Sequence, residues 1–230
     1  MLEFGTTPEQ FGAVAVSCRR HANLNPDAVM HGRPMTIDDY LAAPFLAEPL
    51  RLLDSCLISD GGAAYVTTSV DRARDLKQTP AIVGGIGEGY SDSGGHWSQQ
   101  PAFTSTPQVF SAPPAFAMAD VAPGDVDVLT VYDPFTVVSL MQIEDMGFCP
   151  KGEAGAFVSD GALLYDSGRL PFNTHGGLLS HAYVLGIAHV VEVVKQLRGT
   201  AAAQVPGCEV GVYGGYTGMN ASTLILRKDR

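Results

Sequence analysis

The chain has 230 residues, 46% of them apolar, and a formal net charge of −10. This length fits one large domain or two small ones around a buried core, and the composition excludes an intrinsically disordered chain. The acidic balance argues against a nucleic-acid-binding protein, because such proteins need Lys and Arg to replace the counterions of the phosphates.

The cysteines lie far apart in the sequence, at Cys18, Cys56, Cys149 and Cys208. Without a C-x-x-C pair they predict neither a zinc site nor a disulfide framework, which fits a reducing compartment. No apolar run approaches the roughly 18 residues of a membrane span, and the N-terminus lacks the basic start of a signal peptide. We therefore expect a soluble, cytoplasmic protein that contains no metal and spans no membrane.

The first predicted elements are two helices. Thr7 and Gln10 form a capping box around Pro8, and apolar residues follow at helical spacing. A second, short helix begins after Thr36 and ends before Pro44, because proline cannot continue a helix.

Strands are predicted next, over residues 50–57 and 63–68, because both stretches are rich in apolar or β-favouring residues. Ser69 then begins a charged helix that reaches Leu76. Another buried strand is predicted over residues 81–87. Its glycines resemble a dinucleotide-binding loop only superficially, since no helical pattern follows them.

The remaining elements alternate between helix and strand. Residues 88–114 are rich in Gly, Ser, Gln and Pro, which predicts a long surface or lid loop. A strand over residues 126–131, helices over 135–146 and 183–197, and a hairpin of residues 209–213 with 222–227 follow. This order predicts an α/β protein with a mixed sheet.

Three segments carry a resemblance to a known family. Residues 173–186 read N-T-H-G-G-L-L-S-H-A-Y-V-L-G. They resemble the N-x-x-G-G-x-x-S-x-G-H-P-x-G segment of the thiolase superfamily, in the branch related to sterol-carrier-protein thiolases, with Tyr183 in place of the catalytic His. Residues 50–66 resemble the strand and S-D-G-A-A turn of that family. Residues 126–135 resemble its strand ending in H-D-x-F, with Tyr132 at the polar position.

Two cysteines of the family are missing from the chain. The C-terminal C-x-G-G-G-x-G signature survives as V-Y-G-G-Y-T-G, so Val212 replaces the general-acid thiol. Nothing before Met1 supplies the nucleophilic cysteine of the first half, and Cys18 and Cys56 are expected to be core residues. The chain is then either a fragment or a protein that has lost acyl-enzyme chemistry, and it should expose apolar surface toward a partner.

The resemblance implies a layered α-β-α-β-α fold with mixed sheets and an incomplete first half. Residues 1–76 would be the tail of the N-terminal thiolase-like half, and residues 77–230 the C-terminal half. It also implies a homodimer and a partner protein built from a zinc ribbon and an OB-fold.

The substitution pattern resembles the thiolase-like aldol lyases of steroid side-chain breakdown, which split a 17-hydroxy steroid carboxyl-CoA into a ketone and propionyl-CoA. Retro-aldol cleavage of a β-hydroxyacyl-CoA needs a base and an enolate stabiliser, but no cysteine. The resemblance makes Tyr132 and Tyr183 the catalytic candidates, with coenzyme A as part of the substrate and no separate cofactor. Alternatively, both tyrosines fill the core near strand ends.

The candidates for substrate binding gather around the same motifs: Asn173, His175, Gly176, Gly177, Gly214, Gly215 and Tyr216. Asn173 and His175 could anchor a thioester carbonyl, although a turn histidine is more often structural. The glycines permit close backbone approach. Tyr216 lines a pocket or packs across a hairpin.

Five other side chains have simpler interpretations. Asp133 either orients the site or caps the helix that follows it, and capping is the simpler expectation. His189 is expected to be a buried helix residue. Arg19, Arg20 and Arg33 could meet CoA phosphates, although exposed arginines usually face solvent without a ligand.

Three functions are therefore compatible with the sequence. The first is an acyl-CoA aldol lyase. The second is a thiolase or acyl-CoA acyltransferase fragment whose nucleophilic cysteine lies on missing sequence. The third is a noncatalytic subunit of an acyl-CoA-processing complex.

Overall fold

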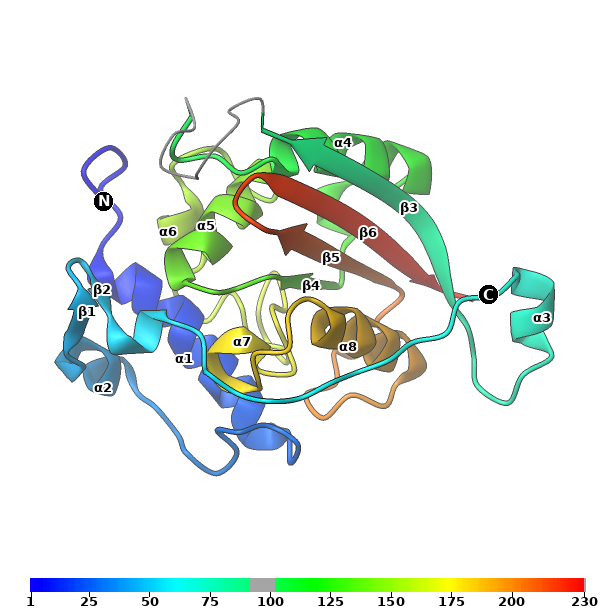
Figure 1. Cartoon of the computed structure of the whole chain (residues 1–230), viewed down its shortest axis with the longest axis horizontal. Helices are drawn as coiled ribbons and strands as arrows, with labels where there is room; N and C mark the ends of the chain where they lie inside the picture. The colour runs from blue at the N-terminus through cyan, green and yellow to red at the C-terminus, as the bar shows by residue number, and fades with distance from the viewer. Residues whose placement is uncertain (92–101, 230) are drawn as a thin grey trace.

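The computed structural model describes residues 1–91 and 102–229, and its centre is a four-stranded sheet in the order β3-β6-β5-β4 (Figure 1). β3 (Ala81–Tyr90) pairs antiparallel with β6 (Asn220–Lys228), which pairs antiparallel with β5 (Val210–Tyr216). β4 (Val128–Val131) runs parallel to β5. The predicted mixed sheet is confirmed.

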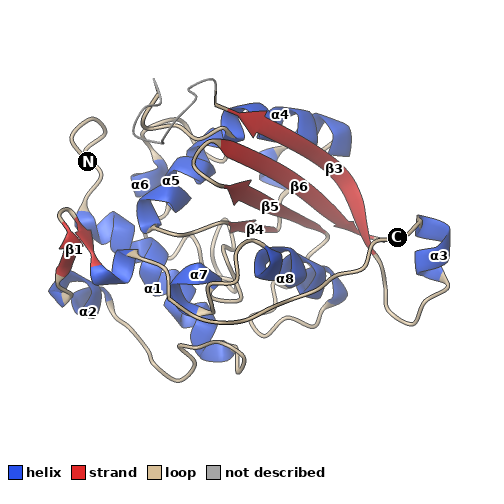
Figure 2. Ribbon diagram, viewed as in Figure 1, coloured by secondary structure: helices blue, strands red, loops and turns tan. Residues whose placement is uncertain are grey.

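Helices cover both faces of this sheet (Figure 2). α4 (Gln108–Ala119) and α5 (Thr136–Asp145) lie on one face, and α8 (Ile187–Arg198) lies on the other. Side chains alternate along a strand. Accordingly, Leu129 of β4 belongs to the core shared with α4 and α5, whereas Val128 packs with valines of α8.

The N-terminal residues form a helical layer beside α5. α1 (Pro8–Leu24) packs against α2 (Ile37–Ala42), α6 (Ala154–Phe157) and α7 (Gly177–Ser180). The capping box is confirmed, since the Thr7 N–H donates to the Gln10 side chain at 3.0 Å. Smaller elements complete the chain: the two-stranded sheet of β1 (Phe45–Ala47) and β2 (Leu50–Arg51), α3 (Val70–Arg74), and the 3-10 turns η1 (Leu52–Asp54) and η3 (Pro123–Asp125).

The strand predicted over residues 50–57 is wrong beyond Arg51. The chain turns there because the buried Asp54 carboxylate accepts the Arg51 N–H at 2.6 Å and the Tyr40 hydroxyl at 2.7 Å. These bonds favour the tight turn η1 over an extended strand.

The strand predicted over residues 63–68 is also wrong. We call residues 55–68 the arm; in Figure 1 it crosses α7 and α8 toward the C-terminus. Its residues 63–68 have β-favouring side chains but no strand beside them, and β-propensity mostly measures packing against neighbours. Ile58 and Val66 are 104% and 91% exposed, so the arm presents the apolar surface that the sequence predicts.

The loop predicted over residues 88–114 is shorter than expected. β3 continues to Tyr90 and α4 begins at Gln108, despite the prolines inside that helix, while residues 92–101 lie outside the described residues. The glycines of β3 explain how closely α4 packs on this strand. A Cβ at Gly85 or Gly87 would collide with a carbonyl oxygen of α4, so these glycines let the helix backbone lie directly on the strand.

The last predicted helix begins four residues later than expected, at Ile187 rather than Tyr183. Leu185 has a positive φ of 58°, which breaks the helical path before that point. Tyr183 therefore lies in the loop of residues 181–186. The predicted division of the chain near residue 76 stays a prediction.

Candidate active site

Tyr132 and Tyr183 meet at one edge of the sheet. Tyr132 follows β4 directly, and its N–H donates to the Gly214 carbonyl at 2.9 Å. Tyr183 comes from the loop between α7 and α8. Their hydroxyl oxygens are 2.6 Å apart, although the two residues are separated by 51 positions. The structure thus brings together the two side chains that the sequence singled out.

The surroundings keep Tyr132 protonated. Burial, and then the hydrogen bond with Tyr183, raise the pKa of Tyr132 well above its ordinary value. Either hydroxyl can donate the hydrogen bond between the two tyrosines.

The arm holds the Tyr183 loop from outside. Ser59 Oγ accepts the Tyr183 N–H at 2.7 Å. The N–H groups of Cys56 and Leu57 donate to the carbonyls of Pro134 at 2.9 Å and Leu178 at 3.0 Å. Sequence reasoning missed Ser59, although it stands in the same S-D-G turn that carried part of the resemblance.

Asp133 does not cap the helix that follows it, contrary to the prediction. The fully buried carboxylate accepts the N–H groups of Leu178 at 2.9 Å and Leu179 at 3.4 Å, both in α7. It also lies 3.0 Å from Nε2 of His189. The prediction that His189 is a buried helix residue is confirmed.

Asn173 serves the backbone of the sheet. Its side chain accepts the Val131 N–H at 2.9 Å and donates to the Val131 carbonyl at 3.1 Å. Together with the bridge between Leu129 and Phe172, this amide extends the sheet beyond β4. Both of these side-chain hydrogen bonds thus join Asn173 to the backbone of β4, and neither is made to Tyr132 or Tyr183.

His175 is buried in a cluster of histidines. Its ring centroid lies 4.7 Å from that of His189 and 5.3 Å from that of His181, and neither ring nitrogen has a hydrogen-bond partner within residues 1–91 and 102–229. Burial and the neighbouring histidines lower the pKa of His175 well below its ordinary value. The imidazole is therefore neutral at neutral pH.

The candidate glycines have packing reasons for their identity. A Cβ at Gly177 would collide with Asp133, and Gly176 has a φ of 112°, which favours glycine. Gly214 faces the core, whereas Gly215 lies against Ser222 and Tyr213. Substrate binding by these glycines stays a prediction.

A pocket of about 250 Å³ opens beside Tyr132. Its lining is mostly apolar and consists of Tyr132, Pro134, Phe135, Val138, Tyr216, Thr217 and Gly218. Burial, and then Asp145, raise the pKa of Tyr216 to about 12, so this side chain is also protonated. The pocket can receive an apolar group in contact with Tyr132.

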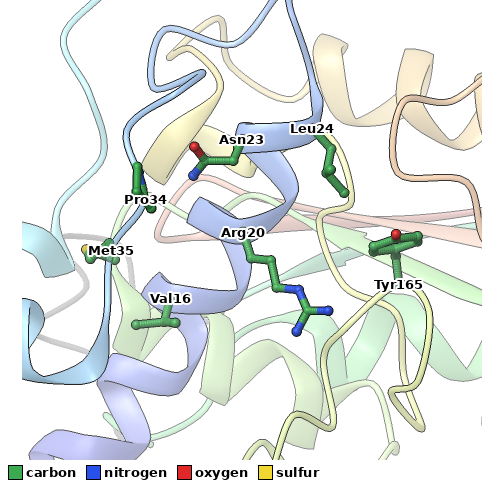
Figure 3. Close-up of a pocket in the computed structure, with 7 residues that line it drawn as sticks. All are labelled: Val16, Arg20, Asn23, Leu24, Pro34, Met35 and Tyr165. Carbon is green, nitrogen blue, oxygen red and sulfur yellow. The ribbon is translucent and has the colours of Figure 1, made fainter.

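A second pocket, of about 350 Å³, lies along α1, and neither Tyr132 nor Tyr183 lines it (Figure 3). Arg20 lines it and forms an ion pair with Asp166 at 3.1 Å. Arg19 is buried instead, where it donates to Ser180 Oγ at 3.0 Å and to the Arg33 carbonyl at 3.3 Å. Of the three arginines, Arg19 is therefore part of the fold.

The thiols of the four cysteines are free. Burial raises the pKa of the cysteines at all four positions, Cys18, Cys56, Cys149 and Cys208. Val212 is fully buried where the superfamily has a thiol. Within the part of the chain that the structure describes, no group of three or more His, Cys, Asp or Glu side chains could hold a metal ion. The same residues include no helix long and apolar enough to cross a membrane.

Comparison with known proteins identifies the family of this chain. Residues 89–228 match the family described as Thiolase C-terminal domain-like. The chain belongs to this thiolase-like family. The family predicted from the motifs is thereby confirmed.

Relatives of this family cover nearly the whole chain. It is 43% identical to the 17-hydroxy-3-oxo-4-pregnene-20-carboxyl-CoA lyase of Mycobacterium tuberculosis, over 96% of this chain and 58% of that protein. It is 42% identical to a steroid side-chain-cleaving aldolase of Thermomonospora curvata, over 100% of this chain and 59% of that protein. The chain thus spans about three fifths of the length of these relatives.

A solved structure described as "Ltp2-ChsH2(DUF35) aldolase" superimposes with a TM-score of 0.95 at 39% identity, covering 100% of this chain and 61% of that chain. This likeness confirms the predicted thiolase-like α/β fold. The contact between Tyr132 and Tyr183 is an observation on this chain itself and does not depend on these relatives.

Proposed function

We propose that this protein is part of a thiolase-like aldol lyase, which cleaves a carbon–carbon bond of a β-hydroxyacyl-CoA. The observation that carries the proposal is the 2.6 Å contact between the Tyr132 and Tyr183 hydroxyls, at positions where the superfamily has polar catalytic residues. Val212, in place of a thiol, argues against thiolysis. The names of the relatives support a steroid side-chain CoA thioester as substrate, and we propose propionyl-CoA as the product.

The two tyrosines have different roles in this reaction. Tyr183 takes the proton from the β-hydroxyl, and Tyr132, in hydrogen-bond contact with Tyr183 at 2.6 Å, supports it in that step. The Cα–Cβ bond then breaks, the hydroxyl carbon becomes a ketone, and the electron pair passes to the thioester as an enolate. Tyr183 returns the same proton to Cα. The reaction therefore consumes no free CoA and no redox cofactor.

The substrate needs more surface than this chain provides near the tyrosines. The pocket beside Tyr132 measures about 250 Å³, below the roughly 300–1,000 Å³ of typical ligand pockets. We propose that it takes the short acyl part of the thioester, while further polypeptide covers the bulky apolar part. A partner protein is supported by the aldolase structure whose description includes ChsH2(DUF35). The zinc-ribbon and OB-fold composition of that partner and the homodimer stay predictions.

The test is an incubation of the purified chain, alone and with a candidate partner polypeptide, with a 17-hydroxy steroid carboxyl-CoA and no free CoA. We expect mass spectrometry to detect propionyl-CoA and the steroid ketone in equal amounts. Tyr183→Phe, prepared in parallel, should yield neither product.

Other outcomes would point to the alternatives. Product formed only after free CoA is added would indicate thiolysis. No product with or without CoA, from protein shown to be folded by circular dichroism, would favour a noncatalytic subunit.

A further inference from the structure

Tyr132 and Tyr183 stand on segments that do not adjoin in the sequence, so their separation depends on what joins these segments. Tyr132 ends β4. Tyr183 lies in the loop of residues 181–186, with α7 before it and α8 after it. Asp133, adjacent to Tyr132, binds both of these helices through Leu178 and His189.

We propose that Asp133 and His189 are a positioning pair that sets the contact between the two tyrosine hydroxyls. This inference rests on the proposed function of the tyrosines. Neither residue touches the substrate; both act through the tyrosines. Asp133 anchors α7 through the N–H groups of Leu178 and Leu179, and His189 anchors the first turn of α8. The loop between the two helices carries Tyr183 toward Tyr132.

The hydrogen bonds of Asp133 fit this role. Its carboxylate is fully buried and accepts two backbone N–H groups and one imidazole N–H. A buried carboxylate without such donors would be costly, so the bonds hold all three segments together. The fit is close, because a Cβ at Gly177 would collide with Asp133 Oδ2.

The protonation of His189 follows from its surroundings. Nε2 lies 3.0 Å from the Asp133 carboxylate, whereas Nδ1 is buried with no partner within the described residues. A neutral imidazole carries one N–H, and the carboxylate takes it. We therefore assign a proton to Nε2 of His189, which donates to Asp133.

The experiment compares three variants of buried histidines in the complete enzyme. His189→Gln keeps an N–H donor near the position of Nε2, whereas His189→Leu removes it. His21→Leu is the matched control, because His21 is also fully buried on a helix and makes one hydrogen bond, which it accepts from Tyr165 N–H at 3.2 Å.

The first measurement does not depend on activity. Fluorotyrosine is incorporated, and the ¹⁹F resonances of Tyr132 and Tyr183 are assigned with Tyr132→Phe and Tyr183→Phe. In His189→Leu we expect the Tyr132 resonance to move to the position that it has in Tyr183→Phe. The Tyr183 resonance should likewise move to the position that it has in Tyr132→Phe. His189→Gln and His21→Leu should leave both resonances in place. In the native protein, ¹⁵N spectra should show a proton on Nε2 of His189.

The second measurement is steady-state turnover. A misplacement of about 1 Å can cost about 100-fold in rate, so His189→Leu should lower kcat by about that factor. KM should change less than about threefold, since binding contacts remain. His189→Gln should recover most of kcat.

Unchanged tyrosine resonances in His189→Leu would overturn the inference, as would an equal movement in His21→Leu. If His189→Leu does not fold, Asp133→Asn is measured in the same way and carries the same expectation. If the resonances move as expected but the native protein cleaves no thioester, the positioning pair stands and the proposed function fails.

Discussion

At the scale of single residues, the proposed chemistry depends on the hydroxyl groups of Tyr132 and Tyr183. Tyr132→Phe and Tyr183→Phe each remove one hydroxyl and leave the ring in place. Because general acid–base groups contribute about 10²–10⁴-fold, we expect kcat to fall by that factor in each variant while the thermal midpoint changes little. The check is turnover together with differential scanning calorimetry.

The double variant adds a sharper criterion. Groups that act as one unit are not additive. Tyr132→Phe with Tyr183→Phe should therefore be scarcely slower than the worse single variant. Full turnover in either single variant would return the tyrosines to the role of core residues.

The tyrosines could be found from the sequence because they stand inside recognisable motifs. Ser59 and the partners of Asp133 could not. Ser59 binds the Tyr183 backbone across 124 positions, and Asp133 reaches Leu178 across 45. Nothing in local composition reports such distant contacts. A helix cap was the natural expectation for Asp133, because capping is the commonest local use of an aspartate.

At the scale of elements, the glycines of β3 determine how closely α4 lies on the sheet. In Gly87→Ala the new Cβ would collide with the Ser111 carbonyl oxygen in α4. Overpacking of this kind costs about 1–3 kcal/mol, so the free energy of unfolding should fall by that amount in urea titrations.

Gly84→Ala is the matched control on the same strand. Its Cβ would meet only the Arg227 side chain at 3.4 Å, an ordinary contact. We expect a change within about 0.5 kcal/mol. Equal losses in the two variants would show that strand propensity, rather than the approach of α4, governs both positions.

Local signals predicted the elements that local interactions make. The capped helix α1, the buried strand β4 and the hairpin of β5 and β6 all have their signals within the sequence of the element. Two predictions failed for the opposite reason: the strand over residues 63–68, and the loop over residues 88–114 in its part from Gln108 onward. The first has strand composition without a neighbouring strand, and the second forms a helix because the glycine face of β3 accepts it despite Pro113 and Pro114.

At the scale of the whole molecule, buried histidines make stability depend on pH. Burial lowers the pKa of His21 from 6.5 to about 4. Between these values the unfolded chain binds more protons than the folded one, so stability falls as pH drops from 6.5 through about 4. The full effect is about 3 kcal/mol, at about 1.4 kcal/mol for each pH unit. His175 acts in the same direction.

The dependence can be measured with one pair of variants. His21→Gln removes this titration and should flatten the slope of unfolding free energy against pH below 6.5. His31→Gln, at an exposed position, should leave the slope as it is. Parallel slopes in His21→Gln and the native protein would contradict the assignment.

The protonated thiols have a consequence for the protein in a living cell. Thiolate is the form that peroxide and electrophiles attack, and burial holds all four cysteines in the thiol form. A thiolase stops working when its nucleophilic cysteine is oxidised or alkylated. The proposed catalysis by the hydroxyls of Tyr132 and Tyr183 does not depend on a cysteine that oxidation or alkylation could inactivate. If the proposed function is correct, iodoacetamide or hydrogen peroxide at doses that inactivate a cysteine-dependent thiolase should leave turnover unchanged.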